Sequence, residues 1–320
     1  MERLKSFLEY ILTPSVPVIT IGLLIVFLAP ILLHLFITRQ TPYTSLPSIL
    51  LAGPAGAGKT SLLTLLERGS AAPASTHTSQ SAHAVELTVS SAEGEKKKQL
   101  SFREAARDDA PGAHRKFYLV DTPGHGKLRG AAMAQLGGSN NIGKSGSAGG
   151  IGGGSGKGSG GSQQTAFSDP SLLRGVIFVV DAAALDESIA DAATYLYDVL
   201  LALQKRASAS QTSRSPHSVP VLVAANKLDL FTALPASLVR SNLESELARI
   251  RQSRSKGLLD SGVGTDEVGS EEQDTWLGEY GSEKFSFGQM REFDVEVEVL
   301  GGSVLEGNVD RWWDWISGRI

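Results

Sequence analysis

The chain has 320 residues, a formal net charge of −4 and 41% hydrophobic side chains, which allows one or two domains with a sizeable core. Because this charge gives no basic signal of the kind that nucleic-acid-binding proteins carry, we expect no direct contact with nucleic acids. Cysteine is absent, which excludes disulfide bonds and thiolate metal sites.

The N-terminal part of the chain predicts a membrane anchor. Between Glu9 and Arg39 there is no Asp, Glu, Lys or Arg. About 20 apolar residues are enough to cross a hydrocarbon core about 30 Å thick, whereas the apolar part of a cleaved signal peptide has only about 7–15 residues. We therefore expect a short tail over residues 1–15, a transmembrane helix over 16–37 and a linker over 38–45.

A glycine-rich loop follows the linker. Residues 47–52 resemble a short buried strand, and residues 53–60 (GPAGAGKT) match the pattern GxxxxGK[ST] ahead of an apolar helix pattern. In such a P-loop the backbone N–H groups surround the phosphates of a nucleotide, the Lys reaches the β- and γ-phosphates and the hydroxyl binds Mg²⁺. The positive end of the next helix also favours phosphate. The nucleotide-binding residues expected here are Gly53, Pro54, Ala55, Gly56, Ala57, Gly58, Lys59, Thr60 and Ser61.

A second motif, DTPGH, occupies residues 121–125, directly after a plausible strand at 116–120. The Asp121 carboxylate at a strand end is placed to hold Mg²⁺, usually through water. The Gly124 N–H is placed to contact the γ-phosphate and so to detect its presence. His125 stands where many GTPases orient the attacking water, which makes it the candidate catalytic residue.

A third motif, NKLD, follows an apolar strand pattern at residues 219–225. The Asp229 carboxylate can accept two hydrogen bonds from guanine, and adenine offers no such pair of donors on that edge. A buried polar edge of this kind discriminates strongly between bases. We expect the Lys227 stem to pack over the base and Asn226 to tie this loop to the P-loop.

Two parts of the expected site match their usual motifs less closely. The first switch should supply a hydroxyl to Mg²⁺ and the γ-phosphate, and in residues 75–81 we favour Thr78, with Thr76 as the alternative. The last base-contacting loop, after a strand pattern at 295–300, lacks the usual Lys, so a backbone contact near Ser303 is expected to replace it. The expected Mg²⁺ ligands are Thr60, Thr78 and Asp121.

Apolar strands alternate with helices along the chain, and a further strand pattern lies at residues 176–181. This alternation predicts an α/β fold of the P-loop NTPase type, with a mostly parallel sheet, helices on both faces and the nucleotide at the carboxyl ends of the strands. We place this domain at 46–320. Its interruptions are a Gly/Ser-rich insert at 137–164, which cannot bury enough apolar surface to order itself, and polar loops at 207–218 and 253–273.

The last helix expected in the chain has an apolar stripe formed by Val309, Trp312, Trp313 and Ile316. These positions share one helical face, so we expect them to pack against the sheet. Trp315 lies off this stripe, where it could face the membrane or a partner.

The order and spacing of the three motifs resemble those of Ras-like small GTPases. DTPGHGKLR at residues 121–129, the anchor directly before the domain, and the WLG at 276–278 ahead of FSF at 285–287 resemble the β-subunit family of the signal recognition particle receptor. The resemblance implies GTP and Mg²⁺ as cofactors and a single-pass protein of the endoplasmic reticulum membrane with a cytosolic GTPase domain. It also implies GTP-dependent recruitment of the receptor α subunit through its N-terminal domain, and indirectly of the ribosome and the signal recognition particle, for co-translational protein targeting.

Two alternatives remain at this point: an Arf/Sar-like trafficking GTPase, and a membrane tether that holds GTP without turnover. Glu2 argues against the first, because myristoylation needs a glycine directly after the initiator Met. The second differs from the receptor subunit only in turnover. His125 in place of Gln leaves the rate open, and we expect a slow GTPase that needs a partner.

Overall fold

The computed structural model describes residues 16, 19–20, 23–24, 26–30, 46–69, 75–90, 99–100, 114–137, 172–209, 218–260, 276–278 and 284–320. The chain divides into two units, Met1–Ser45 and Leu46–Ile320. The expected tail and linker, most of the expected transmembrane helix and the Gly/Ser-rich insert beyond Gly137 lie outside the described residues. Within the ranges given above, no helix has the length and hydropathy that a membrane span requires.

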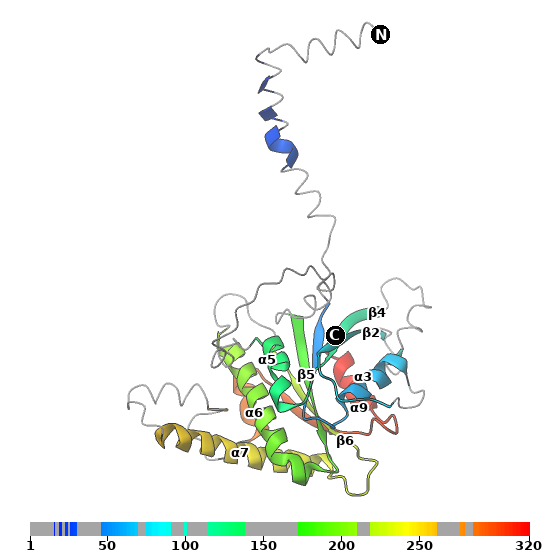
Figure 1. Ribbon diagram of the computed structural model, residues 1–320, viewed down its shortest axis with the longest axis vertical. Helices are drawn as coiled ribbons and strands as arrows, with labels where there is room; N and C mark the ends of the chain where they lie inside the picture. Colours follow the sequence, from blue (N-terminus) through cyan, green and yellow to red (C-terminus); the bar gives the residue numbers. More distant parts are fainter. Residues whose placement is uncertain are drawn as a thin grey trace, which may run out of the picture. The chain divides into compact units, whose positions relative to one another are not determined.

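The second unit is built on a seven-stranded sheet with the order β3-β2-β4-β1-β5-β6-β7 (Figure 1). Five of its strands are parallel: β1 (Ser48–Ala52), β4 (His114–Asp121), β5 (Leu173–Asp181), β6 (Val221–Asn226) and β7 (Val297–Gly301). The antiparallel edge consists of β2 (His83–Ser90), paired with β4, and β3 (Gln99–Leu100), paired with β2. The mostly parallel sheet is therefore confirmed, whereas β2 and β3 were not predicted.

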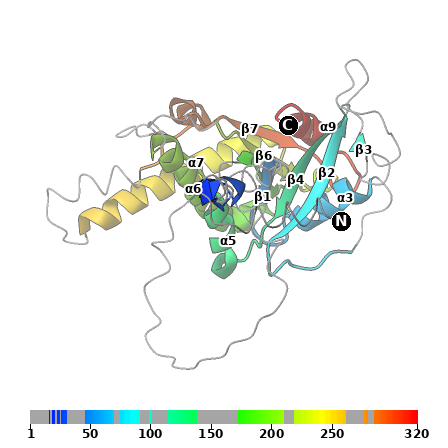
Figure 2. The ribbon, with the colours of Figure 1, turned by 90° about the horizontal axis from the view of Figure 1, so that it is seen from above.

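Helices cover both faces of this sheet, as expected (Figure 2). One face carries α3 (Lys59–Arg68) and α9 (Asp310–Ser317), and the other carries α5 (Gly130–Gln135), α6 (Leu185–Ala209), α7 (Ala236–Asp260) and the 3₁₀ helix η3 (Phe287–Phe293). Because successive strand residues point to opposite faces, Ile49 of β1 joins the α3/α9 core and Leu50 joins the α6/α7 core. Both faces of the central strands are buried, which explains their continuous apolar sequences.

Two helices continue into segments for which the sequence predicts polar loops. Helix α6 ends at Ala209 and helix α7 at Asp260. The extension of α7 packs on α6: Arg254 Nη2 donates to Asp198 Oδ1 at 2.8 Å, and the Arg254 guanidinium lies 4.3 Å from the centre of the Tyr197 ring. These contacts stabilise the helical conformation of the polar sequence at the end of α7.

The expectation for Trp315 is wrong, although the apolar stripe itself is buried. Trp315 is only 5% exposed. Its ring lies against β5, where a Cβ atom added to Gly175 would come within 2.8 Å of Trp315 Cη2. The Arg319 guanidinium covers the ring at 4.1 Å from its centre. Helical periodicity alone places Trp315 off the core face. The missing side chain of Gly175 leaves the space in which its indole ring is buried.

Candidate nucleotide-binding site

The P-loop connects β1 to α3 and depends on glycine. Gly53, Gly56 and Gly58 have φ angles of 134°, 78° and 102°, a region that residues with a side chain rarely adopt. An added Cβ at Gly53 would lie 2.2 Å from the Val179 carbonyl oxygen, and one at Gly58 would lie 2.3 Å from Asn226 Nδ2. Glycine is therefore required both for the turn and for its packing.

The positive end of α3 opens directly from this loop. Gly58 is its N-cap and provides no side-chain hydrogen bond to the first turn, so the helix begins with backbone donors that suit an anion. The Lys59 ammonium donates to the carbonyl oxygens of Gly53 and Pro54 at 2.8 Å each. Burial lowers the pKa of Lys59 to about 8, while the Asp121 carboxylate opposes this shift.

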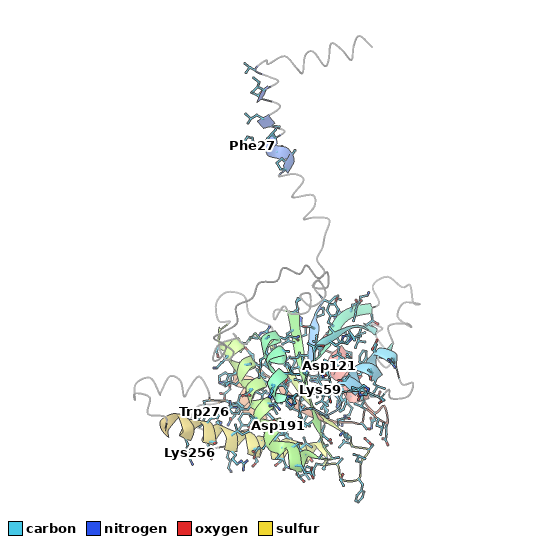
Figure 3. The ribbon with its side chains drawn as sticks, in the orientation of Figure 1. Phe27, Lys59, Asp121, Asp191, Lys256 and Trp276 are labelled. Atoms are coloured by element: carbon cyan, nitrogen blue, oxygen red, sulfur yellow. The ribbon has the colours of Figure 1, made fainter. Side chains whose placement is uncertain are left out.

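Thr60 and Asp121 meet beside this lysine, as Figure 3 shows for the labelled Lys59 and Asp121. Thr60 Oγ1 donates to Asp121 Oδ2 at 2.6 Å, and Ser79 Oγ lies 3.5 Å from Thr60 Oγ1. Asp121 is 1% exposed, and its Oδ1 has no hydrogen-bond partner among the residues described. Burial raises the pKa of this carboxyl group, against the effects of the Thr60 hydrogen bond and the Lys59 charge.

This arrangement fits a magnesium ion. Mg²⁺ prefers oxygen ligands, and at nucleotide sites it needs only one or two carboxylates besides phosphate and water. The described residues contain no group of three or more His, Asp or Glu suited to a metal, so this part of the chain offers no closed metal cage. An unpartnered buried carboxylate oxygen next to a threonine hydroxyl is the donor set that an Mg²⁺–phosphate complex would complete.

A pocket of about 250 Å³ extends from the P-loop to the segment at residues 76–79. Thr78 and Thr76 both line it, and Thr76 Oγ1 lies 2.9 Å from Ser61 Oγ. The hydroxyl that contacts Thr60 beside Asp121 belongs to Ser79, whereas the sequence favoured Thr78 and Thr76 in the same segment. The lining residues are Ala55, Gly56, Gly58, Lys59, Thr60, Ser61, Thr76, His77, Thr78, Ser79 and Gly124.

Gly124 closes this pocket, whereas His125 is not among its lining residues. An added Cβ at Gly124 would lie 2.6 Å from each of Ala55 N, the Gly53 oxygen and Lys59 Nζ, so this residue packs against the P-loop. His125 is exposed, and its Nδ1 accepts from the Lys127 N–H at 3.4 Å at the start of the 3₁₀ helix η1 (Gly126–Leu128).

The NKLD residues join the P-loop to the last loop of the sheet. Asn226 Nδ2 donates to the Ala57 oxygen at 2.8 Å, and its Oδ1 accepts from the Val304 N–H at 3.0 Å. The expected link from Asn226 to the P-loop is therefore present. Asp229 Oδ1 accepts from Ser303 Oγ at 2.5 Å, which brings two of the predicted base-binding residues together.

Lys227 has a neighbour that sequence reasoning missed. Its backbone φ is 67°, and its ammonium forms an ion pair with Asp181 at the end of β5. The other Asp181 oxygen accepts from the N–H groups of Ala183 and Ala184, at 3.0 and 3.3 Å, before α6 begins. The position of Asp181 at the end of a strand pattern suggests a functional carboxylate, but its pairing with Lys227 depends on the fold and cannot be predicted from the sequence.

The chain as a whole resembles known proteins. Residues 44–142 and 163–293 match the family model described as the signal recognition particle receptor beta subunit. The chain belongs to this family. A member from Saccharomyces cerevisiae, the signal recognition particle receptor subunit beta, is 27% identical over 276 residues, which cover 86% of this chain and 84% of that protein.

Two solved structures of the family, both from Chaetomium thermophilum, resemble this chain over the full length of their own chains. The receptor's SRb–GTP/SRX complex is 40% identical, covers 86% of this chain and 100% of its own, and superposes with a TM-score of 0.64. The SRb–GDP–Mg structure is 42% identical, covers 88% and 100%, and gives a TM-score of 0.55. The family, and with it the small-GTPase fold expected from the motifs, is therefore established for this chain.

Proposed function

We propose that this chain is the GTP-binding, membrane-anchored β subunit of a signal recognition particle receptor, and that its GTP form recruits the receptor α subunit to the endoplasmic reticulum membrane. The observation that carries this proposal is the convergence of Lys59, the Thr60–Asp121 pair and Asp229 at one edge of the sheet. Family membership and the relatives solved with GTP, or with GDP and Mg, support it.

The chemistry of the pocket suits an Mg²⁺–nucleotide. The P-loop N–H groups and the first turn of α3 would receive the phosphates, and Lys59 would leave its loop carbonyls for the β- and γ-phosphates. Thr60 and Asp121 would hold Mg²⁺, directly or through water, with a hydroxyl from Thr78, Thr76 or Ser79. Bound Mg²⁺ would neutralise phosphate charge. Asp229, oriented by the hydrogen bond from Ser303, would accept hydrogen bonds from the donor edge of guanine.

We further propose that hydrolysis is slow without a partner. His125 is the candidate for positioning water, but it is exposed and tied to the Lys127 N–H. The 125–128 segment would have to rearrange before the imidazole reached the pocket. A protein docked on this segment would supply that change, because GTPases commonly receive catalytic help in trans.

The partner and membrane parts of the proposal rest on the family and on the sequence. The SRX component of the Chaetomium GTP complex supports an α-subunit partner that recognises the GTP form. The apolar segment 16–37 supports anchoring by a single span with the GTPase domain in the cytosol, where GTP is available.

A pull-down tests the proposal directly. The full chain in detergent is loaded with GTP or GDP in the presence of Mg²⁺ and offered to an immobilised N-terminal domain of a receptor α subunit. We expect capture of the GTP form alone. Thr60→Asn should prevent capture, because Asn cannot replace the hydroxyl at the magnesium side of the site. Equal capture of both nucleotide forms would refute the switch, and failure to bind any guanine nucleotide would refute the site itself.

A further inference from the structure

Arg129 lies just beyond the DTPGH motif and is tied to helix α6 by three contacts. Its Nη2 is 2.7 Å from both carboxylate oxygens of Asp191, and its guanidinium lies 4.5 Å from the centre of the Tyr195 ring. The Arg129 side chain is only 14% exposed. A guanidinium held by a carboxylate and an aromatic face has little freedom to move.

The same side chain approaches the residue that closes the pocket. Arg129 Nε lies 3.5 Å from the Gly124 carbonyl oxygen, and Gly124 itself packs against the P-loop and Lys59. Arg129 therefore connects Gly124, in the loop after β4, to Asp191 of helix α6. That helix is firmly placed, because Tyr195 is fully buried and meets Phe178 of β5 edge-on at 5.4 Å.

From this connection we propose that Arg129 and Asp191 are positioning residues for the γ-phosphate. Arg129, held by Asp191, fixes Gly124 through its carbonyl oxygen so that the Gly124 N–H can meet that phosphate, and the pair therefore favours GTP over GDP. The inference rests on the proposed function, since it concerns the same pocket. Neither side chain touches the nucleotide in this scheme, and both act through the position of Gly124.

Helix α6 carries a matched control for this arrangement. Asp198, Arg254 and Tyr197 repeat the same combination of carboxylate, guanidinium and ring, with an N–O distance of 2.8 Å and a guanidinium 4.3 Å from the ring centre. This second group joins α6 to α7, whereas the first reaches Gly124 of the pocket lining through Arg129. A loss of general stability should follow from breaking either group, whereas a change in nucleotide preference should follow only from the first. Figure 3 labels Asp191 on α6.

The experiment compares Asp191→Asn with Asp198→Asn in the full chain in detergent, with Mg²⁺ present. Affinities for GTP and for GDP are measured separately by calorimetry. Allosteric couplings typically correspond to fivefold changes or more, so Asp191→Asn should weaken GTP binding by roughly fivefold and change GDP binding by less than about twofold. Asp198→Asn should leave the ratio of the two affinities unchanged, and Asp191→Glu should restore most of the GTP preference.

Three results would overturn the inference. The first two are that Asp191→Asn reduces both affinities by the same factor, or that it changes neither. The third is that Asp198→Asn changes the ratio of GTP to GDP affinity as much as Asp191→Asn does. These results leave the proposed function standing, because the wild type still binds guanine nucleotides. If the wild type bound neither GTP nor GDP, the proposed function would fail as well, and the inference with it.

Discussion

Asp229 is the residue on which base selection depends in the proposed site. Ser303 donates to its Oδ1 at 2.5 Å, and the carboxylate retains capacity for the two donors on the guanine edge. Ser303 thus orients the carboxylate from the loop in which the Lys of other small GTPases is missing. This hydrogen bond differs from the backbone contact to guanine that the sequence predicts near Ser303, and that backbone contact stays a prediction.

Asp229→Asn should shift nucleotide preference from guanine to xanthine. The Asn amide can donate to the extra oxygen of xanthine but faces the exocyclic amine of guanine with a like donor. A buried mismatch of this kind is costly, so we expect GTP affinity to fall by about a hundredfold or more, while xanthosine triphosphate binds better than it does to wild type. Competition binding with the two nucleotides measures this, and Asp310→Asn serves as an exposed control. Unchanged preference would mean that Asp229 does not read the base.

Asp181→Asn should weaken GTP and GDP binding equally. Asp181 pairs with Lys227 and accepts from the N–H groups of Ala183 and Ala184, directly before α6 begins. Asn can still accept from these N–H groups but loses the charge that holds the Lys227 ammonium, whose stem would lie over the base in the proposed site. A partly exposed ion pair contributes up to about 1 kcal/mol, so we expect about a fivefold loss for each nucleotide. Separate titrations with GTP and GDP test this. A loss confined to GTP would assign Asp181 to the phosphates instead.

The helices and strands that the sequence predicts correctly are those whose structure is determined by residues close together in the chain. β1, the P-loop and α3 were predictable together, because glycines, an apolar strand and a helical stripe coincide within residues 47–66. β2 was not, because it is defined largely by its antiparallel pairing with β4, to which residues 83–90 are brought by the fold. The burial of Trp315 depends in the same way on a glycine in a distant strand.

Gly175→Ala tests that contact between elements. The new methyl group would lie 2.8 Å from Trp315 Cη2 and 3.5 Å from the Pro220 oxygen, and overpacking of this kind costs about 1–3 kcal/mol. We expect the midpoint of chemical denaturation to fall accordingly. Gly288→Ala is the control, since its nearest neighbour would be Ser286 Oγ at 3.7 Å. Adding Trp315→Phe to Gly175→Ala removes the overlapping atom and should recover part of the loss. If Gly175→Ala left the denaturation midpoint unchanged, Trp315 would not be packed against Gly175.

For the molecule as a whole, the site brings two buried groups of opposite charge to one edge of the sheet. Burial lowers the pKa of Lys59 to about 8 and raises the pKa of Asp121. Phosphate favours the charged lysine and Mg²⁺ favours the charged carboxylate. Nucleotide binding should therefore take up a proton at Lys59 as pH rises through 8, and release one from Asp121 as pH falls through its raised pKa. Affinity should decline on both sides of the interval between the two pKa values.

The proton taken up at Lys59 can be counted. At pH 8 about half of the nucleotide-free molecules carry a neutral Lys59, so binding should take up about half a proton, against about a tenth at pH 7. Calorimetric titration of the full chain with Mg²⁺–GDP, in two buffers that differ in ionisation enthalpy, gives this number. Because the bound state holds more protons than the free state, affinity must fall as pH rises above 8. Identical heats in both buffers at pH 8 would show that Lys59 is already fully charged before the phosphates arrive, and that burial at the P-loop does not hold its pKa down.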